Sequence, residues 1–120
     1  MSRVLLADDH DLVRDTLAAY LRSEGGFDVA VAGRFDDALA MVRAQDGFDL
    51  VLLDGAWSLY LPVLRILESR LAPGALVIAE NAVDESGDYL TYVRDPGSGY
   101  RSLPLPFEPG RGNEMSVYVA

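Results

Sequence analysis

The sequence contains no cysteine and no lysine, so all ten of its basic residues are arginines. Without cysteine, disulfide bonds and thiolate metal sites are excluded. Without lysine, every mechanism that needs a lysine amine is excluded as well. Long apolar runs are also missing, since none approaches the ~20 residues that span a bilayer. The first residues carry one arginine before a short strand-like run, which is not typical of a signal peptide. We therefore expect a cytoplasmic protein.

Positive charge is scarce, and the formal net charge is -9. Nucleic-acid backbones and anionic membranes repel such a surface, so neither is an expected partner. No obligatory partner of any other kind is indicated. A chain of 120 residues is one domain by size, and residues 1–120 are expected to fold as a single unit.

The most informative stretch is the apolar run from Phe48 to Asp54, which is followed by Gly55. Such a run predicts a central strand of a parallel sheet that is buried on both faces. Ligands of open α/β sheets bind beyond the carboxyl ends of the strands. Asp54 therefore points to the expected site.

The rest of the chain alternates strands and helices before it ends in a hairpin. Strands are expected at 3–7, 27–31, 48–54 and 75–79, with a helix after each at about 11–24, 35–44, 58–71 and 85–94. Val13, Leu17, Tyr20 and Leu21 recur at helical spacing in the first helix, and Pro73-Gly74 is expected to end the third. Two alternating runs, 101–107 and 115–119, predict an antiparallel hairpin whose proline-containing first strand lies at the sheet edge.

These elements predict an α/β fold, a three-layer α/β/α Rossmann-like sandwich. Strands joined by right-handed crossovers, with the last strand between the fourth and the edge, give the order 2-1-3-4-6-5. Strand 6 is then antiparallel to its neighbours in a six-stranded mixed sheet.

Residues 1–54 carry Asp8-Asp9 after the first strand, Asp11-Leu12-Val13-Arg14 at the helix start, and Asp54 at the end of the third strand. In these features the segment resembles the receiver domain of bacterial response regulators. The resemblance implies that the acidic pair holds Mg²⁺ and that Asp54 accepts a phosphoryl group. A receiver also needs a hydroxyl residue where Ala79-Glu80 stand and a lysine after the fifth strand, which this chain lacks.

Residues 48–120 carry Leu53-Asp54-Gly55, Tyr60-Leu61-Pro62, Leu71-Ala72-Pro73-Gly74-Ala75 and Ala79-Glu80-Asn81. This part is similar to the C-terminal half of class I S-adenosylmethionine-dependent O-methyltransferases of the catechol or caffeoyl-CoA type. The resemblance implies that Asp54, Glu80 and Asn81 bind a divalent cation. The glycine-rich cofactor loop of that family is replaced by Ala7-Asp8-Asp9-His10-Asp11.

Each resemblance supplies what the other lacks, and the two overlap in the 48–54 strand. The leading interpretation is therefore an engineered or recombined chimeric scaffold without catalytic activity, which is not an enzyme and binds no S-adenosylmethionine. It keeps at most a weak Mg²⁺ or Ca²⁺ site, made by carboxylates and an amide that are expected to converge at one sheet edge. A cation is favoured there because the like charges of the carboxylates repel one another. The predicted ligands are Asp8, Asp9, Asp54, Glu80 and Asn81, with His10 expected to be a solvated loop residue.

Two other functions stay open at this point. One is a receiver domain that is phosphorylated on Asp54. The other is an S-adenosylmethionine-dependent O-methyltransferase, which the missing glycines make the weakest of the three.

Overall fold

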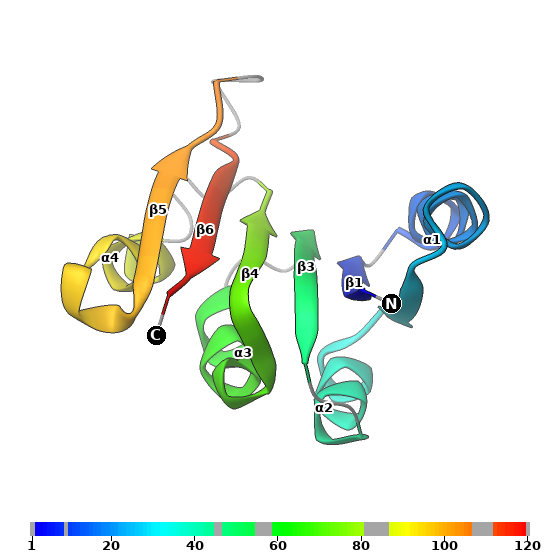
Figure 1. The fold of residues 1–120 in the computed structure, drawn as a ribbon, viewed down its shortest axis with the longest axis horizontal. Coiled ribbons are helices and arrows are strands. Elements are labelled where there is room, and N and C mark those ends of the chain that lie inside the picture. Colours follow the sequence, from blue (N-terminus) through cyan, green and yellow to red (C-terminus); the bar gives the residue numbers. More distant parts are fainter. Residues whose placement is uncertain are drawn as a thin grey trace.

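The computed structural model describes residues 2–8, 10–44, 47–54, 59–80, 87–106 and 112–119. A six-stranded sheet runs through the molecule in the order β2-β1-β3-β4-β6-β5 (Figure 1). The strands are β1 (Arg3–Asp8), β2 (Asp28–Ala32), β3 (Phe48–Asp54), β4 (Leu71–Ala79), β5 (Tyr100–Pro104) and β6 (Glu114–Tyr118). The helices are α1 (Asp11–Gly25), α2 (Phe35–Ala44), α3 (Tyr60–Leu67) and α4 (Gly87–Arg94), with short 3₁₀ turns η2 (Glu68–Arg70) and η3 (Pro96–Ser98).

The strand pairing confirms the fold class and order expected from the sequence. β1 pairs in parallel with β2 and β3, and β3 pairs in parallel with β4. β6 is antiparallel to both β4 and β5, so the last strand lies inside the sheet and β5 forms its edge. Pro104, which cannot donate a ladder hydrogen bond, thus stands on an edge strand.

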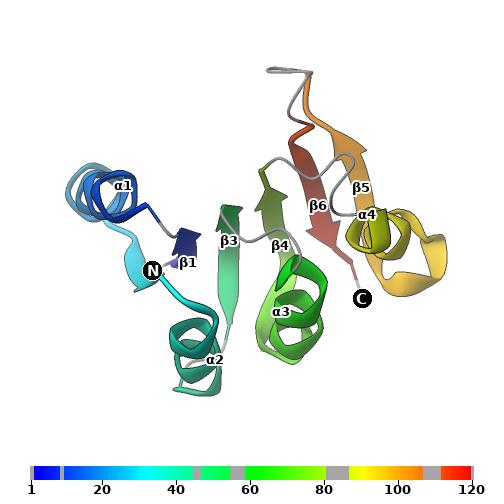
Figure 2. The same ribbon diagram turned by 180° about the vertical axis from the view of Figure 1, so that it is seen from behind.

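Helices cover the two faces of the sheet unequally. α2, α3 and α4 lie together on one face, and α1 lies on the other face over β1 and β2 (Figures 1 and 2). The larger core fills the space beneath the three helices, and its largest fully buried side chains include Phe48, Val51, Leu64, Leu67, Val77, Tyr89, Val93 and Tyr100. The smaller core lies under α1 and is built on Val4, Leu6, Ala18 and Val29.

The boundary between α3 and β4 differs from the expected one. Pro73-Gly74 does not end a helix, because α3 stops at Leu67 and β4 already begins at Leu71. Leu71 is buried and pairs with Phe48, whereas Leu76 is the partner of Leu50. The intervening residues therefore loop out of register, and Gly74 adopts a φ of 83° that favours glycine.

The inward face of α1 also differs from the expected one. Ala18 is buried and Leu17 and Leu21 are half-buried, but Val13 and Tyr20 are 54% and 63% exposed. The side of α1 that carries Arg22 faces β2, since Arg22 Nη2 donates to the Val29 carbonyl at 2.8 Å. This orientation leaves Val13 and Tyr20 exposed on the side of α1 away from β2.

Candidate functional site at the carboxyl ends of β1 and β3

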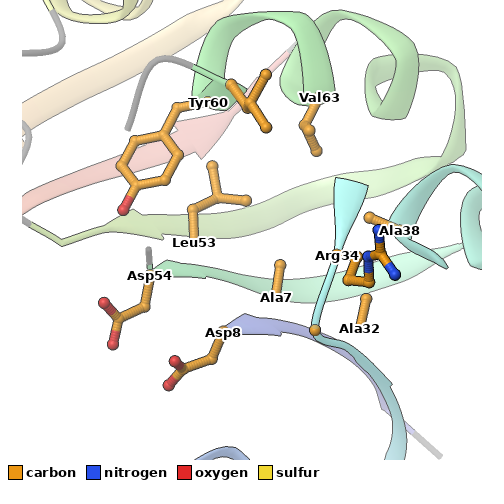
Figure 3. Close-up of a pocket in the computed structure, with 11 residues that line it drawn as sticks. Ala7, Asp8, Ala32, Arg34, Ala38, Leu53, Asp54, Tyr60 and Val63 are labelled. Atoms are coloured by element: carbon orange, nitrogen blue, oxygen red, sulfur yellow. The ribbon is translucent and has the colours of Figure 1, made fainter. Parts of the chain in front are cut away.

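The candidate site lies where the helices diverge from the sheet. The chain leaves β1 for α1 on one face and leaves β3 for α3 on the other (Figures 1 and 2). A ligand crevice of an α/β sheet forms at such a switch point, beyond the carboxyl ends of the strands. Asp8 ends β1, Asp54 ends β3, and the two residues are direct partners in the parallel pairing. Figure 3 shows their carboxylates side by side on the same side of the strand ends.

Asp8 forms a close pair with His10. The Asp8 side chain is 3% exposed, and its Oδ1 accepts a hydrogen bond from the His10 backbone N–H at 2.8 Å. The His10 Nδ1 lies 3.2 Å from the same oxygen, while the imidazole is 70% exposed. His10 is therefore solvated, as expected, but it also belongs to the site. One potential ligand atom each from Asp8, His10 and Asp54 lies within 4.8 Å of the others.

The environment of Asp54 opposes its negative charge. Burial raises the pKa of Asp54 from 3.8 to about 7, helped by a hydrogen bond with the Glu80 carboxyl and by the charges of Asp8 and Glu80. The nearby His10 acts in the opposite direction on this pKa. Protonation of Asp54 is therefore favoured well above the usual range of a carboxyl group. A cation placed between these carboxyls would relieve the repulsion.

Glu80 is positioned by its backbone. Its N–H donates to the Leu53 carbonyl at 2.9 Å, which continues the β3–β4 pairing by one step. Its carbonyl accepts a hydrogen bond of 3.0 Å from the Tyr60 hydroxyl in the first turn of α3. Asp8, Asp54 and Glu80 therefore meet at one sheet edge as the sequence predicted. Asp9 and Asn81, the other two predicted ligands, lie outside the described residues, and metal binding itself stays a prediction.

A cleft of about 230 Å³ opens beside the two aspartates. Its walls are mostly small or branched apolar side chains from the ends of β1, β2 and β3 and from the starts of α2 and α3 (Figure 3). The cleft is lined by Ala7, Asp8, Ala32, Gly33, Arg34, Ala38, Leu53, Asp54, Leu59, Tyr60 and Val63. Sequence reasoning missed this cleft, although the small residues Ala7, Ala32 and Gly33 at two strand ends could have indicated it.

An arginine closes one side of the strand ends. Arg14 Nη1 lies 3.4 Å from the Asp8 carbonyl, to which it donates, and a Cβ at position 33 would overlap this same nitrogen. Gly33 thus makes room for the guanidinium of Arg14. The edge therefore combines acidic groups with the positive charge of Arg14, and Arg34 adds a second one in the lining of the cleft.

No family model matches the chain. Its curated relatives include a protein-glutamate methylesterase/protein-glutamine glutaminase from Anaeromyxobacter dehalogenans, which is 38% identical over 93 residues. The match covers 71% of this chain but only 26% of the relative, so the chain spans about a quarter of that protein.

Solved methyltransferase structures match nearly the whole chain. A methyltransferase from Geobacter sulfurreducens has a TM-score of 0.62 at 21% identity, covering 99% of this chain and 60% of that one. An O-methyltransferase from Bacillus cereus in complex with SAH has a TM-score of 0.61 at 16% identity, covering 98% and 62%. An O-methyltransferase from Streptomyces achromogenes in complex with SAM has a TM-score of 0.57 at 17% identity, covering 98% and 73%.

These matches correct the interpretation of the chain as a chimeric scaffold. A graft that begins at residue 48 would resemble methyltransferases only from that residue on, but the structural match extends through residues 1–47 as well. The expectations that the chain is not an enzyme and that it binds no S-adenosylmethionine are contradicted for the same reason, since folds that carry SAM or SAH superpose on it throughout. Replacement of the glycine-rich loop therefore does not prevent the chain from adopting the fold of these methyltransferases.

The matches do not show a receiver domain in residues 1–54. The segment Arg3–Asp54 supplies three parallel strands that are common to several α/β folds, so its acidic motif could not decide between them.

Among the described residues, no helix is both long and apolar enough to cross a membrane.

The structural matches show that nearly the whole chain is similar in fold to S-adenosylmethionine-dependent methyltransferases.

Proposed function

We propose that the chain binds S-adenosylmethionine in the cleft between β1 and β3 and serves methyl transfer to an oxygen acceptor. The observation that best supports this proposal is the position of the cleft at the switch point of the sheet. The fold that contains this sheet matches methyltransferase structures over nearly the whole chain. Nucleotide-type ligands of such sheets bind at this point.

The residues of the cleft suit the two ends of this cofactor differently. Its apolar walls, which include Ala32, Ala38 and Val63, offer a dry surface to an adenine ring. The carboxyls of Asp8 and Asp54 at its mouth provide negative charge that complements a sulfonium cation. A volume of about 230 Å³ is below the ~300–1,000 Å³ usual for ligand pockets, so the cleft fits the adenosine part rather than the whole cofactor.

Asp54 is suited to proton transfer. The bound cofactor would supply a methyl group on a positively charged sulfur. An acceptor hydroxyl becomes a good nucleophile when a nearby base takes its proton, and such a base works best when its pKa lies near the working pH. Burial and the neighbouring Glu80 raise the pKa of Asp54 to about 7, which meets this condition. We assign Asp54 this role when no cation is bound, because a cation on its carboxylate would lower its pKa.

A divalent cation is the second proposed ligand of the site. Asp8 and Asp54 offer carboxylate oxygens, which Mg²⁺ and Ca²⁺ prefer, and Glu80 hydrogen-bonds to Asp54. The site would hold the cation through these oxygens, with Asp9 and Asn81 as further proposed ligands. Its chemical contribution would be to polarise the acceptor oxygen.

Isothermal titration calorimetry with S-adenosylmethionine, S-adenosylhomocysteine and adenosine tests the proposal. All three should bind, and Ala38→Leu should weaken binding at least ~tenfold because the added carbons fill the cleft. Ala40→Leu is the matched control, since Ala40 lies on the same helix but is exposed. Thermal melting would establish that both variants fold.

The outcome that would overturn the proposal is a folded protein that binds neither S-adenosylmethionine nor its demethylated product. Catalysis would be followed separately, as formation of S-adenosylhomocysteine with a panel of hydroxylated acceptors and Mg²⁺. Asp54→Asn should abolish this formation, whereas Asp28→Asn, which removes a half-exposed carboxylate at the opposite end of the sheet, should not.

A further inference from the structure

One face of the sheet is left largely open. On the side where α1 lies, no helix in the described part of the chain covers β4, β6 and β5 (Figures 1 and 2). Leu76 pairs with Val117, while Met115 pairs with both Ile78 and Leu103, so these apolar side chains share that face. Arg101, which also pairs with Val117, lies on the same face at the edge strand. Leu76 is 36% exposed and Leu103 is 50% exposed. We call the set Leu76, Ile78, Leu103, Met115 and Val117 the open face.

α1 carries a second apolar surface that faces away from its own sheet. Leu12 is 79% exposed and Tyr20 is 63% exposed. With Thr16, Ala19 and Ser23 they occupy helical positions i, i+4, i+7, i+8 and i+11, and none of the five is charged. A stripe without charge is unusual on the solvent side of a helix in a protein with a net charge of -9. We call these five residues the outer stripe.

We propose that the open face binds the outer stripe of a second copy of this chain. α1 projects from one half of this side of the sheet, and no described helix covers the other half (Figures 1 and 2). A two-fold axis parallel to the strands would set α1 of each copy against the open face of the other. Such an interface is self-complementary, as two-fold dimers require.

The available area fits a small dimer interface. Strands spaced ~4.8 Å apart and five residues long at ~3.3 Å each give the three open strands a flat footprint of ~240 Å². One side of a 15-residue helix adds about 22 Å by ~10 Å, or ~220 Å². The two footprints together give ~460 Å² per copy as a flat projection, to which protruding side chains add, so the expected dimer is weaker than one with the ~800 Å² per partner of a standard interface.

The net charge makes the expected association distinctive. Two copies with a net charge of -9 repel one another, so apolar burial must drive the contact. Added salt screens the repulsion, and the dimer should therefore tighten as NaCl is raised. The dimer contact does not involve the residues of the cleft between β1 and β3, so the proposed dimer does not depend on the proposed cofactor.

Sedimentation velocity of the full chain over a range of concentrations tests the proposal. The expected result is a species of about twice the 13.0 kDa chain mass. Leu76→Glu should raise the dissociation constant at least ~tenfold, and Leu103→Glu should do the same if the first variant folds poorly. Ile66→Glu is the matched control, because Ile66 is an exposed apolar residue on α3, behind the other face of the sheet.

A mixing experiment tests the two-fold arrangement. Leu12→Lys and Leu76→Glu should each weaken self-association, but a mixture should associate more tightly than either alone, because the mixed dimer keeps one unaltered contact. A wild-type chain that stays monomeric at every concentration would overturn the proposal. So would a dimer that survives Leu76→Glu, or a mixture that associates no better than its components.

Discussion

Replacement of Asp54 by asparagine should make the protein more stable at alkaline pH. The folded state raises the pKa of Asp54 from 3.8 to about 7, chiefly because the carboxyl is buried beside Glu80 and Asp8. The folded protein therefore binds a proton that the unfolded chain has already released between these two values. Stability contributed by this group falls as the pH rises from about 4 to 7, and the full penalty is present above about 7.

The size of the effect follows from the same shift. At ~1.4 kcal/mol for each pKa unit, the rise gives an upper limit of ~4 kcal/mol. Asp54 is only partly buried and solvent screens its neighbours, so we expect about 2 kcal/mol in practice. Asparagine cannot ionise and keeps the shape, which removes the penalty. The melting temperature at pH 8 should rise by roughly 8 °C for a chain of this size.

Thermal melting of wild type and Asp54→Asn at pH 5 and pH 8 measures the difference. At pH 5 the native carboxyl is already protonated, so the gain should be much smaller there. Asp28→Asn serves as the control, since its carboxylate is about half exposed beside Arg3 and should show no such pH-dependent gain. Equal gains at both pH values, or a less stable variant at pH 8, would refute the reasoning. Mg²⁺ should reduce the advantage if the carboxyls bind it.

Three further changes test the packing around the site and its frame. Arg94→Ala should cost about 2 kcal/mol in urea unfolding, because the buried Glu114 loses its two-point partner at 2.7 and 2.9 Å although Arg94 itself is half exposed; a cost below ~0.5 kcal/mol would contradict this contribution. Gly33→Ala should cost less than about 1 kcal/mol, because the displaced atom is the tip of the flexible Arg14 side chain, and a double-mutant cycle with Arg14→Ala should show the cost gone. Gly74→Ala should cost about 1 kcal/mol in thermal unfolding because φ is 83°, and a neutral result would show that the bulge relaxes.

Much of the fold could be predicted because local patterns and chain connectivity agree. The apolar run Phe48–Asp54 is typical of a central strand, although its face toward α1 is only partly buried, and the prolines within the 101–107 run predicted an edge strand. The end of α3 was missed because Pro73-Gly74 is as compatible with a strand bulge as with a helix end. Only the pairing of Leu71 with Phe48, a contact between distant parts of the chain, decides between them.

The site was predicted in outline and missed in detail. Asp8, Asp54 and Glu80 each follow a strand, so their meeting at one edge follows from parallel pairing alone. The contact of His10 with Asp8 depends on the path of the chain after β1, which no periodicity encodes. The exposure of Tyr20 depends likewise on how α1 rotates over the sheet. The expectation that the chain is not a methyltransferase depended on one motif, the missing glycines, whereas the fold of the whole chain matches methyltransferase structures.

The position of β6 has a consequence for how the chain folds. β5 has no neighbour in the sheet except β6, and the inner edge of β4 is likewise completed only when Met115 and Val117 pair with Ile78 and Leu76. During synthesis, β4 therefore emerges long before β6, and until then the backbone N–H and C=O groups on this edge of β4 are unpaired. β6 pairs with β4 across about 40 residues of sequence, as in Leu76 with Val117. Such distant pairing raises the contact order and slows folding. Until residues 114–118 are made, this edge of β4 is open to pairing with other chains.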